Sequence, residues 1–345
     1  RSVLQKERPD ALWFMTDPRF YGWLWEIENE VRANLPMVYY HVWDNFPPPQ
    51  FNADFYNSND VVACISKVTH EIVKAVAPEV ESHYVPHAVN EAYFHPVKTD
   101  EEKEKIANLR KNITRGNTKK KIFFWNNRNA RRKQSGTLIW WFKEWLDKVG
   151  HDKATLLMHT DARDPHGQDL PHIINKLGLT EGQVLLSTNK IPSEQLASMY
   201  RTADYTINIS DAEGFGLSTL ESLATETPII VNMTGGLQEQ VTDGKDWFGI
   251  GIEPSSKAII GSQEVPWIYE DRISGSDLVD AMVKIYEMPE EERLELGRKG
   301  RQHVLNNYSM INYITLWKNI LTEIYENGGS WDNRKTKLWS LERMR

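Results

Sequence analysis

Short apolar runs and amphipathic stretches alternate along the first part of the chain. The apolar runs predict short β-strands at 11–15, 37–42, 61–66 and 83–86. The stretches with helical spacing lie at 20–34 and 67–76. Because strands that alternate with helices pair in parallel through crossover connections, this part of the chain predicts a parallel sheet.

The alternation resumes after residue 120. Strands are predicted at 121–126, 154–159, 184–187, 205–209 and 228–232. Helices are predicted at 136–149, 170–177, 193–202 and 217–225, and two further helices at 289–306 and 311–327 follow them. Regular strand–helix units of this kind build a doubly wound domain.

A polar segment at 98–120 separates the two patterns. It is dense in Lys, Glu, Asn and Thr, which predicts a solvated helix and a linker. We therefore expect an N-terminal lobe at 1–117 and a C-terminal lobe at 118–310. The helix at 311–327 is expected to pack back towards the N-terminal lobe, and 328–345 is expected to form a basic tail.

Length and composition are those of a globular protein with two domains. The chain has 345 residues, of which 40% are hydrophobic, and a domain takes roughly 100–200 residues. No apolar run approaches the ~20 residues that span a bilayer, and the polar residues 1–10 predict no signal peptide. The first residue is Arg1 rather than Met, which leaves open that the gene begins upstream.

Net charge and cysteine content limit the binding partners and the cellular compartment that we expect for this protein. The net charge of −7 argues against a general nucleic-acid binder, so no nucleic-acid partner is expected. Cys64 is the only cysteine, so an intramolecular disulfide is excluded and a reducing compartment is favoured. We expect a cytoplasmic protein, either free or peripheral at a membrane.

The strongest chemical signal follows the strand at 205–209. A flexible turn, Gly214-Phe215-Gly216, lets the backbone approach a ligand closely. The helix then begins near Leu217 and Ser218, and its first N–H groups present the positive end of a helix dipole to a phosphate. The backbone of residues 214–218 is therefore a candidate for binding the phosphate-bearing ligand, which would be the donor substrate of a transfer reaction.

Two glutamates flank this turn. Glu213 precedes it and has the chemistry to accept hydrogen bonds from sugar hydroxyls, whereas Glu221 lies in the helix and is placed to reach a ribose diol. The alternative interpretation is an ordinary glycine turn with two solvated glutamates.

This constellation resembles the family-4 (GT4) retaining glycosyltransferases. Their E-x7-E signature matches Glu213 and Glu221, and Gly235-Gly236 is similar to their second glycine loop. The match runs from about residue 121 to 326. The resemblance implies an α/β protein of GT-B fold, with two Rossmann-like doubly wound lobes that face a central cleft.

A basic loop follows the strand at 121–126. The family has an arginine and a lysine with the spacing of Arg128 and Lys133, and they clamp the donor diphosphate. Two cations at this point stabilise the charge on a departing phosphate. The family usually has glycines at Asn127 and Gln134, which puts the backbone geometry of the loop in doubt. The alternative interpretation is a solvated basic turn.

Two further candidates are less specific. Lys190 and Ile191 lie in a loop that resembles the family's nucleobase contact; a plain connection capped by Ser193 is the alternative. His41 ends the strand at 37–42, near the point where family members often carry a histidine that faces the donor sugar. A histidine satisfied within its own lobe is equally compatible with the sequence.

The N-terminal lobe departs from the family. Its usual opening strand, glycine-rich loop and helix have no counterpart in residues 1–20, so the lobe is short or incomplete. Either a segment is absent from this chain or the acceptor site is built differently. An open parallel edge needs cover, so a protein partner or a missing segment over this lobe is expected.

The resemblance implies a retaining glycosyltransferase. It moves a sugar from a UDP- or GDP-type nucleotide sugar to a glycan, lipid or other hydroxyl acceptor. No Asp-x-Asp motif is present, and we expect neither a metal nor a cofactor. The alternatives are a catalytically idle sugar-nucleotide-binding or structural protein, and an epimerase, for which the N-terminal lobe offers no convincing acid–base carboxylates.

Overall fold

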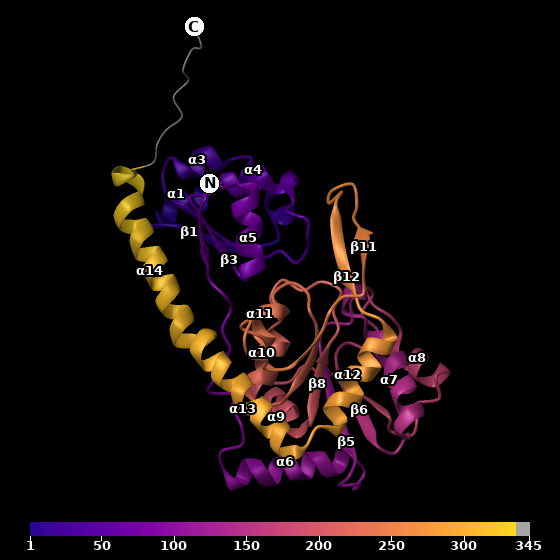
Figure 1. The fold of residues 1–345 in the computed structure, drawn as a ribbon. Coiled ribbons are helices and arrows are strands. Elements are labelled where there is room, and N and C mark those ends of the chain that lie inside the picture. Colours follow the sequence, from indigo (N-terminus) through magenta and orange to yellow (C-terminus); the bar gives the residue numbers. More distant parts are fainter. Residues whose placement is uncertain (336–345) are drawn as a thin grey trace. The chain divides into compact units, whose positions relative to one another are not determined.

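The computed structural model describes residues 1–335, which form two compact units. Unit 1 consists of residues 1–86, 259–269 and the described part of 311–345, and unit 2 consists of 87–258 and 270–310 (Figure 1). The expected basic tail lies outside the described residues from 336 onwards. The lobe boundaries expected from the sequence stay a prediction.

Unit 1 is built on a parallel sheet of four strands in the order β1-β2-β3-β4. The strands are β1 (Leu12–Thr16), β2 (Met37–His41), β3 (Val61–Cys64) and β4 (Glu81–Tyr84). Every residue of β2 and β3 is buried, as expected for strands that helices cover on both faces. Helix α5 (Lys67–Val76) packs on β3 and β4 and begins with a capping box between Ser66 and Thr69.

The continuous helix predicted at 20–34 is wrong. The chain forms α2 (Gly22–Trp25) and α3 (Glu28–Arg32) after a 3₁₀ turn at Pro18–Tyr21. Trp25 packs against Phe14 and Tyr39, and its indole N–H donates to the Pro18 carbonyl at 3.1 Å. This buried ring holds the first turns against the sheet, which interrupts the helix. Further short helices are α1 (Ser2–Glu7) and α4 (Ala53–Asn57).

The end of the described chain also belongs to unit 1. Helix α14 (Met310–Gly328) buries Trp317, whose ring contacts Trp13 of β1 and Tyr40 of β2. Beyond the helix, the Arg334 side chain is only 5% exposed and bonds to the Asp60 carboxylate at 2.6 Å. A partly buried charge pair of this kind ties together residues that lie far apart in the sequence.

Unit 2 contains a parallel sheet of six strands in the order β10-β9-β8-β5-β6-β7. They are β5 (Lys121–Asn126), β6 (Ala154–His159), β7 (Val184–Ser187), β8 (Tyr205–Asn208), β9 (Ile229–Asn232) and β10 (Ile250–Ile252). The order reverses between β5 and β8. In doubly wound sheets, such a switch point opens a crevice at the carboxyl ends of the two strands.

Helices cover this sheet. Helix α7 (Ser135–Val149) packs against α8 (Leu170–Lys176) and α12 (Gly275–Glu287), and it carries the buried aromatic core with β5. Helix α10 (Leu217–Ala224) packs against α13 (Glu290–Asn307), α11 (Leu237–Val241) and α9 (Ser193–Thr202). Helix α6 (Asp100–Ile113), predicted in the polar segment, packs against α9.

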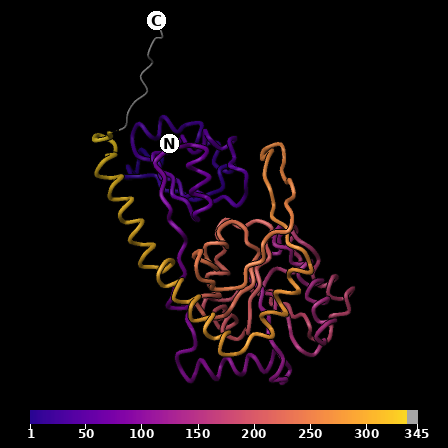
Figure 2. Tube along the Cα trace, in the orientation of Figure 1, coloured from indigo at the N-terminus to yellow at the C-terminus, as the bar shows by residue number. Residues whose placement is uncertain are grey.

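The sequence pattern missed several elements, among them β10 and α12. It also missed β11 (Ser256–Ile260) and β12 (Ile268–Arg272), which form a separate two-stranded ribbon (Figure 2). Residues 259–269 of this ribbon belong to unit 1, where the Tyr269 carbonyl accepts from Nδ2 of Asn45 at 2.7 Å. Within residues 1–335, no helix is both long and apolar enough to cross a membrane.

Candidate functional site

The loops after β5 and β8 meet at the switch point of unit 2. The backbone N–H of Asp211 donates to the Arg132 carbonyl at 2.8 Å, and Nη1 of Arg132 donates to the Ala212 carbonyl at 2.7 Å. These two hydrogen bonds connect the basic loop to the segment that leads into the glycine turn. The topology therefore places the two sequence motifs at one edge of the sheet, where doubly wound proteins bind ligands.

A buried ion pair lies where these loops meet. Nζ of Lys133 donates to Oε2 of Glu213, and both residues are only 8% exposed. Arg132 adds a second cation at 3.9 Å from the same carboxylate oxygen. Burial alone would raise the pKa of Glu213, but the charges of Lys133 and Arg132 outweigh it and lower the pKa. Glu213 is therefore an ionised carboxylate at neutral pH.

The two glycine loops interlock beside this pair. Gly235 has a positive φ of 49°, and an added Cβ would overlap the Glu213 carbonyl oxygen. The N–H of Gly236 donates to that same carbonyl at 3.0 Å. Nε2 of Gln240 donates to the Phe215 carbonyl at 2.8 Å. The loop after β9 thus fixes the main chain of Glu213, and only glycine permits this approach.

Helix α10 starts at the same edge. Its N-cap is Gly216, with φ 95°, and no side chain caps its first amides. Leu217 is 49% exposed and Ser218 is partly buried, whereas Gly214 and Phe215 are buried. A helix that begins without a side-chain cap offers its first N–H groups to an anion.

Arg128 has a different partner from Lys133. Its side chain is 60% exposed and forms a fork with Asp164, with Nε 2.7 Å from Oδ2. The hydrogen bond from Arg128 is the main reason why the pKa of Asp164 falls to about 2. Thus Lys133 and Glu213 are brought together, while Arg128 lies against a carboxylate from the loop after β6.

Glu221 lies in a separate hydrogen-bonded cluster. Its Oε2 accepts from the Tyr200 hydroxyl at 2.8 Å and from Nδ2 of Asn126 at 3.3 Å. Burial raises the pKa of Glu221 to about 7, although both hydrogen bonds act in the opposite direction. The side chain is therefore poised between its neutral and ionised forms near neutral pH.

Gln134 occupies a position where glycine was expected, and it adopts a glycine-like conformation. Its φ of 56° and ψ of 33° are left-handed. Its amide donates to Asp211 and accepts from the Thr137 hydroxyl at 2.7 Å. These two side-chain bonds offset the cost of left-handed backbone, about 1–2 kcal/mol for a residue with a Cβ. Gln134 thus takes up a backbone conformation that glycine adopts readily.

The sequence pattern missed a carboxylate network next to the basic loop. Glu270 of β12 is 3% exposed and binds Arg131 and Arg272, and Arg272 lies 3.2 Å from Asp211. Burial raises the pKa of Asp211 to about 6. A strand that pairs only with its neighbour in a hairpin gives a weak sequence signal, so Glu270 was not singled out.

The remaining candidates are Lys190 and Ile191 in unit 2 and His41 in unit 1. Lys190 is exposed, and Ile191 is partly buried at the rim of an apolar pocket of about 500 Å³, which Met199 and Leu109 also line. In unit 1, His41 is fully buried and its Nε2 lies 3.0 Å from the Tyr56 hydroxyl. Burial lowers the pKa of His41 to about 3. Its Nε2 is thus engaged within its own lobe, whereas its Nδ1 is buried without a hydrogen-bond partner within residues 1–335. A role of His41 towards a donor sugar stays a prediction.

Fold and site together define an α/β protein in which the basic loop and the glycine turn meet at the switch point of a doubly wound sheet. The model for the family "Glycosyl transferases group 1" matches residues 107–303. The chain belongs to this family, GT4, so the resemblance seen in the sequence is confirmed.

Curated relatives match over part of their length. The D-inositol 3-phosphate glycosyltransferase of Corynebacterium urealyticum is 38% identical over 90 residues, which cover 26% of this chain and 21% of that protein. The alpha-monoglucosyldiacylglycerol synthase of Streptococcus pneumoniae is 25% identical over 189 residues, which cover 55% of this chain and 41% of that protein. The chain thus matches well under two thirds of the length of these relatives.

Solved structures share the fold. Sucrose-phosphate synthase from Thermosynechococcus elongatus superposes with a TM-score of 0.71 at 17% identity, covering 94% of this chain and 76% of that chain. Anabaena HepE, in complex with UDP and glucose, has a TM-score of 0.71 at 14% identity, covering 93% and 80%. With its two parallel sheets, the chain has the expected α/β GT-B-like fold.

Proposed function

We propose that this protein is a retaining glycosyltransferase that moves a sugar from a nucleotide-diphosphate sugar to a hydroxyl acceptor. The observation that carries the proposal is the buried pair of Lys133 and Glu213 beside the uncapped start of α10. A cation, an ionised carboxylate and a set of amides at a switch point match the needs of a diphosphate and a hydroxyl-rich sugar.

The chemistry would follow from these charges. The acceptor oxygen bonds to the anomeric carbon while the bond from that carbon to the phosphate oxygen breaks on the same face, and the acceptor proton passes to the leaving phosphate. Lys133 stabilises the negative charge of the departing diphosphate, and the amides of α10 bind its oxygens. Arg128 also stabilises the departing diphosphate once its guanidinium group leaves Asp164 and binds a phosphate oxygen instead. Glu213 orients the sugar by accepting from its hydroxyls.

As the donor we propose a sugar attached to a uridine nucleotide. HepE, which shares the fold, was solved with UDP and glucose, and this makes UDP-glucose the first donor to test, with a GDP-sugar as the comparison. The names of the relatives include an inositol phosphate and a glucosyl lipid. A glycan, a lipid or another hydroxyl compound is accordingly proposed as the acceptor.

Calorimetry with UDP and GDP, followed by a donor hydrolysis assay, tests the proposal. We expect binding of one nucleotide and slow hydrolysis of its sugar conjugate, with the α-anomer of the sugar retained in the product. Binding without any turnover, in the presence of a panel of acceptors, would instead identify a catalytically idle sugar-nucleotide-binding protein. Absence of binding to either nucleotide would contradict the proposal.

Donor turnover is expected to survive removal of divalent ions. The proposed charge stabilisation comes from Lys133, Arg128 and backbone amides, so a metal ion is not required for it. The measurement is the hydrolysis rate before and after treatment with EDTA. Complete loss of the rate, restored by added Mg²⁺ or Mn²⁺, would show that a metal ion carries part of this role.

A further inference from the structure

Glu221 belongs to a closed triangle of hydrogen bonds inside unit 2. The Tyr200 hydroxyl, on α9, and Nδ2 of Asn126, at the end of β5, both bond to its Oε2. Nδ2 of Asn126 also lies 2.9 Å from the Tyr200 hydroxyl oxygen. Both donors act on one oxygen of the carboxylate. Within residues 1–335 no hydrogen bond reaches the other oxygen, Oε1, so this oxygen is the one available to the hydroxyls of a ligand.

The ring of Tyr200 is rigidly held. The residue is 1% exposed, and its ring meets the edge of Phe124 with a centroid separation of 4.9 Å. Phe94 packs against it at 6.1 Å. The Tyr200 carbonyl accepts from the Thr227 hydroxyl at 2.9 Å. A hydroxyl on a side chain that is already immobilised loses little further entropy when it holds a partner in place.

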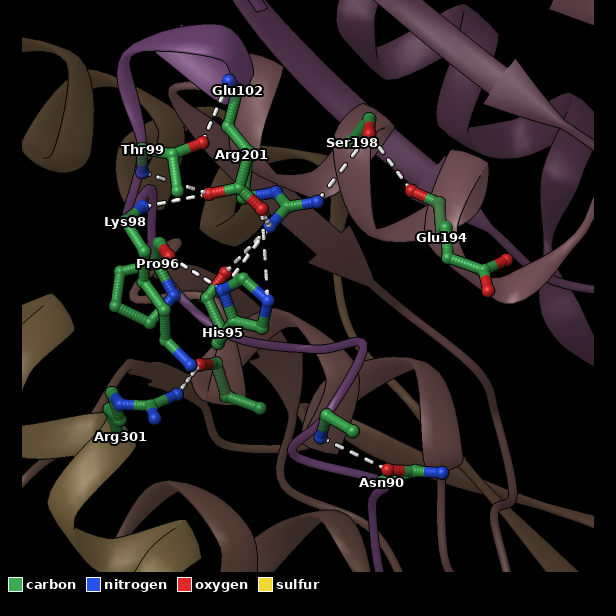
Figure 3. Close-up of polar contacts among 12 residues, drawn as sticks. Asn90, His95, Pro96, Lys98, Thr99, Glu102, Glu194, Ser198, Arg201 and Arg301 are labelled. Carbon is green, nitrogen blue, oxygen red and sulfur yellow. Dashed lines mark hydrogen bonds and ion pairs between the residues drawn. The ribbon is translucent and has the colours of Figure 1, made fainter.

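The next residue anchors the end of α9. Arg201 has a side chain that is 6% exposed, and its Nη1 bonds to Oε1 of Glu102 at 3.0 Å. Figure 3 shows the guanidinium group of Arg201 close to Glu102, His95 and Ser198. Consecutive residues of one helix thus point to two different partners, Tyr200 to Glu221 and Arg201 to Glu102. This arrangement fixes the rotation of α9 and, with it, the position of the Tyr200 hydroxyl.

We propose that Tyr200 is a positioning residue for nucleotide recognition: its hydroxyl holds Oε2 of Glu221 so that Oε1 accepts hydrogen bonds from the ribose diol. The inference rests on the proposed function and on the expected contact of Glu221 with the ribose, and it adds Tyr200 as the residue that positions this carboxylate. Asn126 supports the same oxygen from β5.

The proposal predicts how binding depends on pH. The ionised carboxylate accepts from both ribose hydroxyls, so affinity rises as the pH increases through the pKa of Glu221, about 7. The hydrogen bond from Tyr200 favours the ionised form, and its removal raises this pKa further. The rise in affinity then moves to higher pH.

Three basic side chains on the helices that pack against α10 have partners other than Glu221. On α13, Arg301 donates to the Ala224 carbonyl, and Nε2 of His303 lies 2.9 Å from the Glu239 carbonyl of α11. On α9, Arg201 is bound to Glu102. The pKa of Glu221 is accordingly set by its burial, Tyr200 and Asn126, with no charged neighbour among its causes within residues 1–335.

The test compares UDP with 2′-deoxyuridine diphosphate across a pH series from about 6 to about 9, which brackets the pKa of Glu221, by calorimetry. The unmodified protein should prefer UDP, and its affinity should rise through pH ~7. Tyr200→Phe should bind UDP about ten-fold more weakly at pH ~7, with the midpoint about one unit higher. It should also lose most of its preference for UDP over the deoxy ligand.

Matched variants serve as controls. Tyr205→Phe changes another tyrosine of unit 2 that is 1% exposed. It should leave unchanged both the pH midpoint of UDP affinity and the preference for UDP over the deoxy ligand. Glu221→Gln should abolish the part of the pH dependence that is centred on the pKa of Glu221 and leave only the part due to the terminal phosphate of UDP, whose second pKa is about 6. Asn126→Ala should move the midpoint in the same direction as Tyr200→Phe, and it serves as the test variant if Tyr200→Phe does not fold.

The outcomes separate the inference from the function on which it rests. A folded Tyr200→Phe protein with the original midpoint and the original ribose preference would overturn the role of Tyr200. Equal binding of UDP and the deoxy ligand by the unmodified protein would overturn it too, while nucleotide binding would stand. If the unmodified protein binds no nucleotide at any pH, both proposals fall.

Discussion

Replacement of Lys133 by methionine is expected to reduce turnover of the nucleotide sugar by about 10²–10³-fold, the scale that follows the loss of one preorganised donor to a developing oxyanion. Its ammonium group is the buried cation beside Glu213. The substitution keeps the aliphatic stem of the side chain but removes the charge. The measurement is the rate of donor hydrolysis at saturating donor.

The same change should also lower stability, because Glu213 is left as a buried carboxylate without its nearest cation. Breaking a buried pair from one side costs about 3–5 kcal/mol. The double variant Lys133→Met/Glu213→Gln removes both charges, so it should recover much of this stability in thermal unfolding but none of the activity. Lys143→Met, which removes an exposed i,i+4 pair with Asp147, should change neither quantity appreciably. Normal turnover in Lys133→Met would contradict the proposed site.

Gly235→Ala is expected to impair both folding stability and turnover. The added Cβ would overlap the Glu213 carbonyl oxygen, and the backbone there has a positive φ. Overpacking of this kind costs about 1–3 kcal/mol. The main chain of Glu213 must move to relieve the contact, and a misplacement of about 1 Å near the reacting groups lowers rates by about 10²-fold. Thermal unfolding and donor hydrolysis measure the two effects.

Gly244→Ala is the matched control for this prediction. Gly244 also has a positive φ, 91°, but an added Cβ meets nothing within 4 Å. The Gly244→Ala variant therefore has the backbone strain of an alanine at positive φ, but its added Cβ does not contact Glu213. We expect a small loss of stability and unchanged turnover. Equal losses of turnover in the two variants would show that strain, rather than the position of Glu213, controls the rate.

The sequence predicted the strands and helices around the candidate site because their periodicity is strong. The strands at 121–126, 154–159 and 184–187 have the predicted bounds. The first two are interior, mostly buried strands with continuous apolar runs, and the third is a short apolar run at the edge of the sheet. The sequence marked Lys133 and Glu213 as candidates in the loops after two strands, but their pairing at the switch point is seen only in the structure.

Other features depend on long-range contacts that a single sequence does not display. Arg128 and Lys133 lie in one loop with similar charge, yet only the structure assigns Arg128 to Asp164. The left-handed backbone of Gln134 is supported by Asp211, a residue far along the chain. The ribbon of β11 and β12 has exposed and partly buried residues that lack a clear alternation, so its pattern did not predict strands.

The division of unit 1 into three separate stretches of sequence has a consequence for biosynthesis. Its sheet strands leave the ribosome first, but residues 259–269 and α14, which complete the unit, emerge only after most of unit 2. Closing such distant contacts is slow, because a long intervening loop must be ordered first. Until those residues emerge, part of the apolar surface of the nascent β1–β4 segment is expected to stay uncovered, which makes this segment prone to aggregation during synthesis.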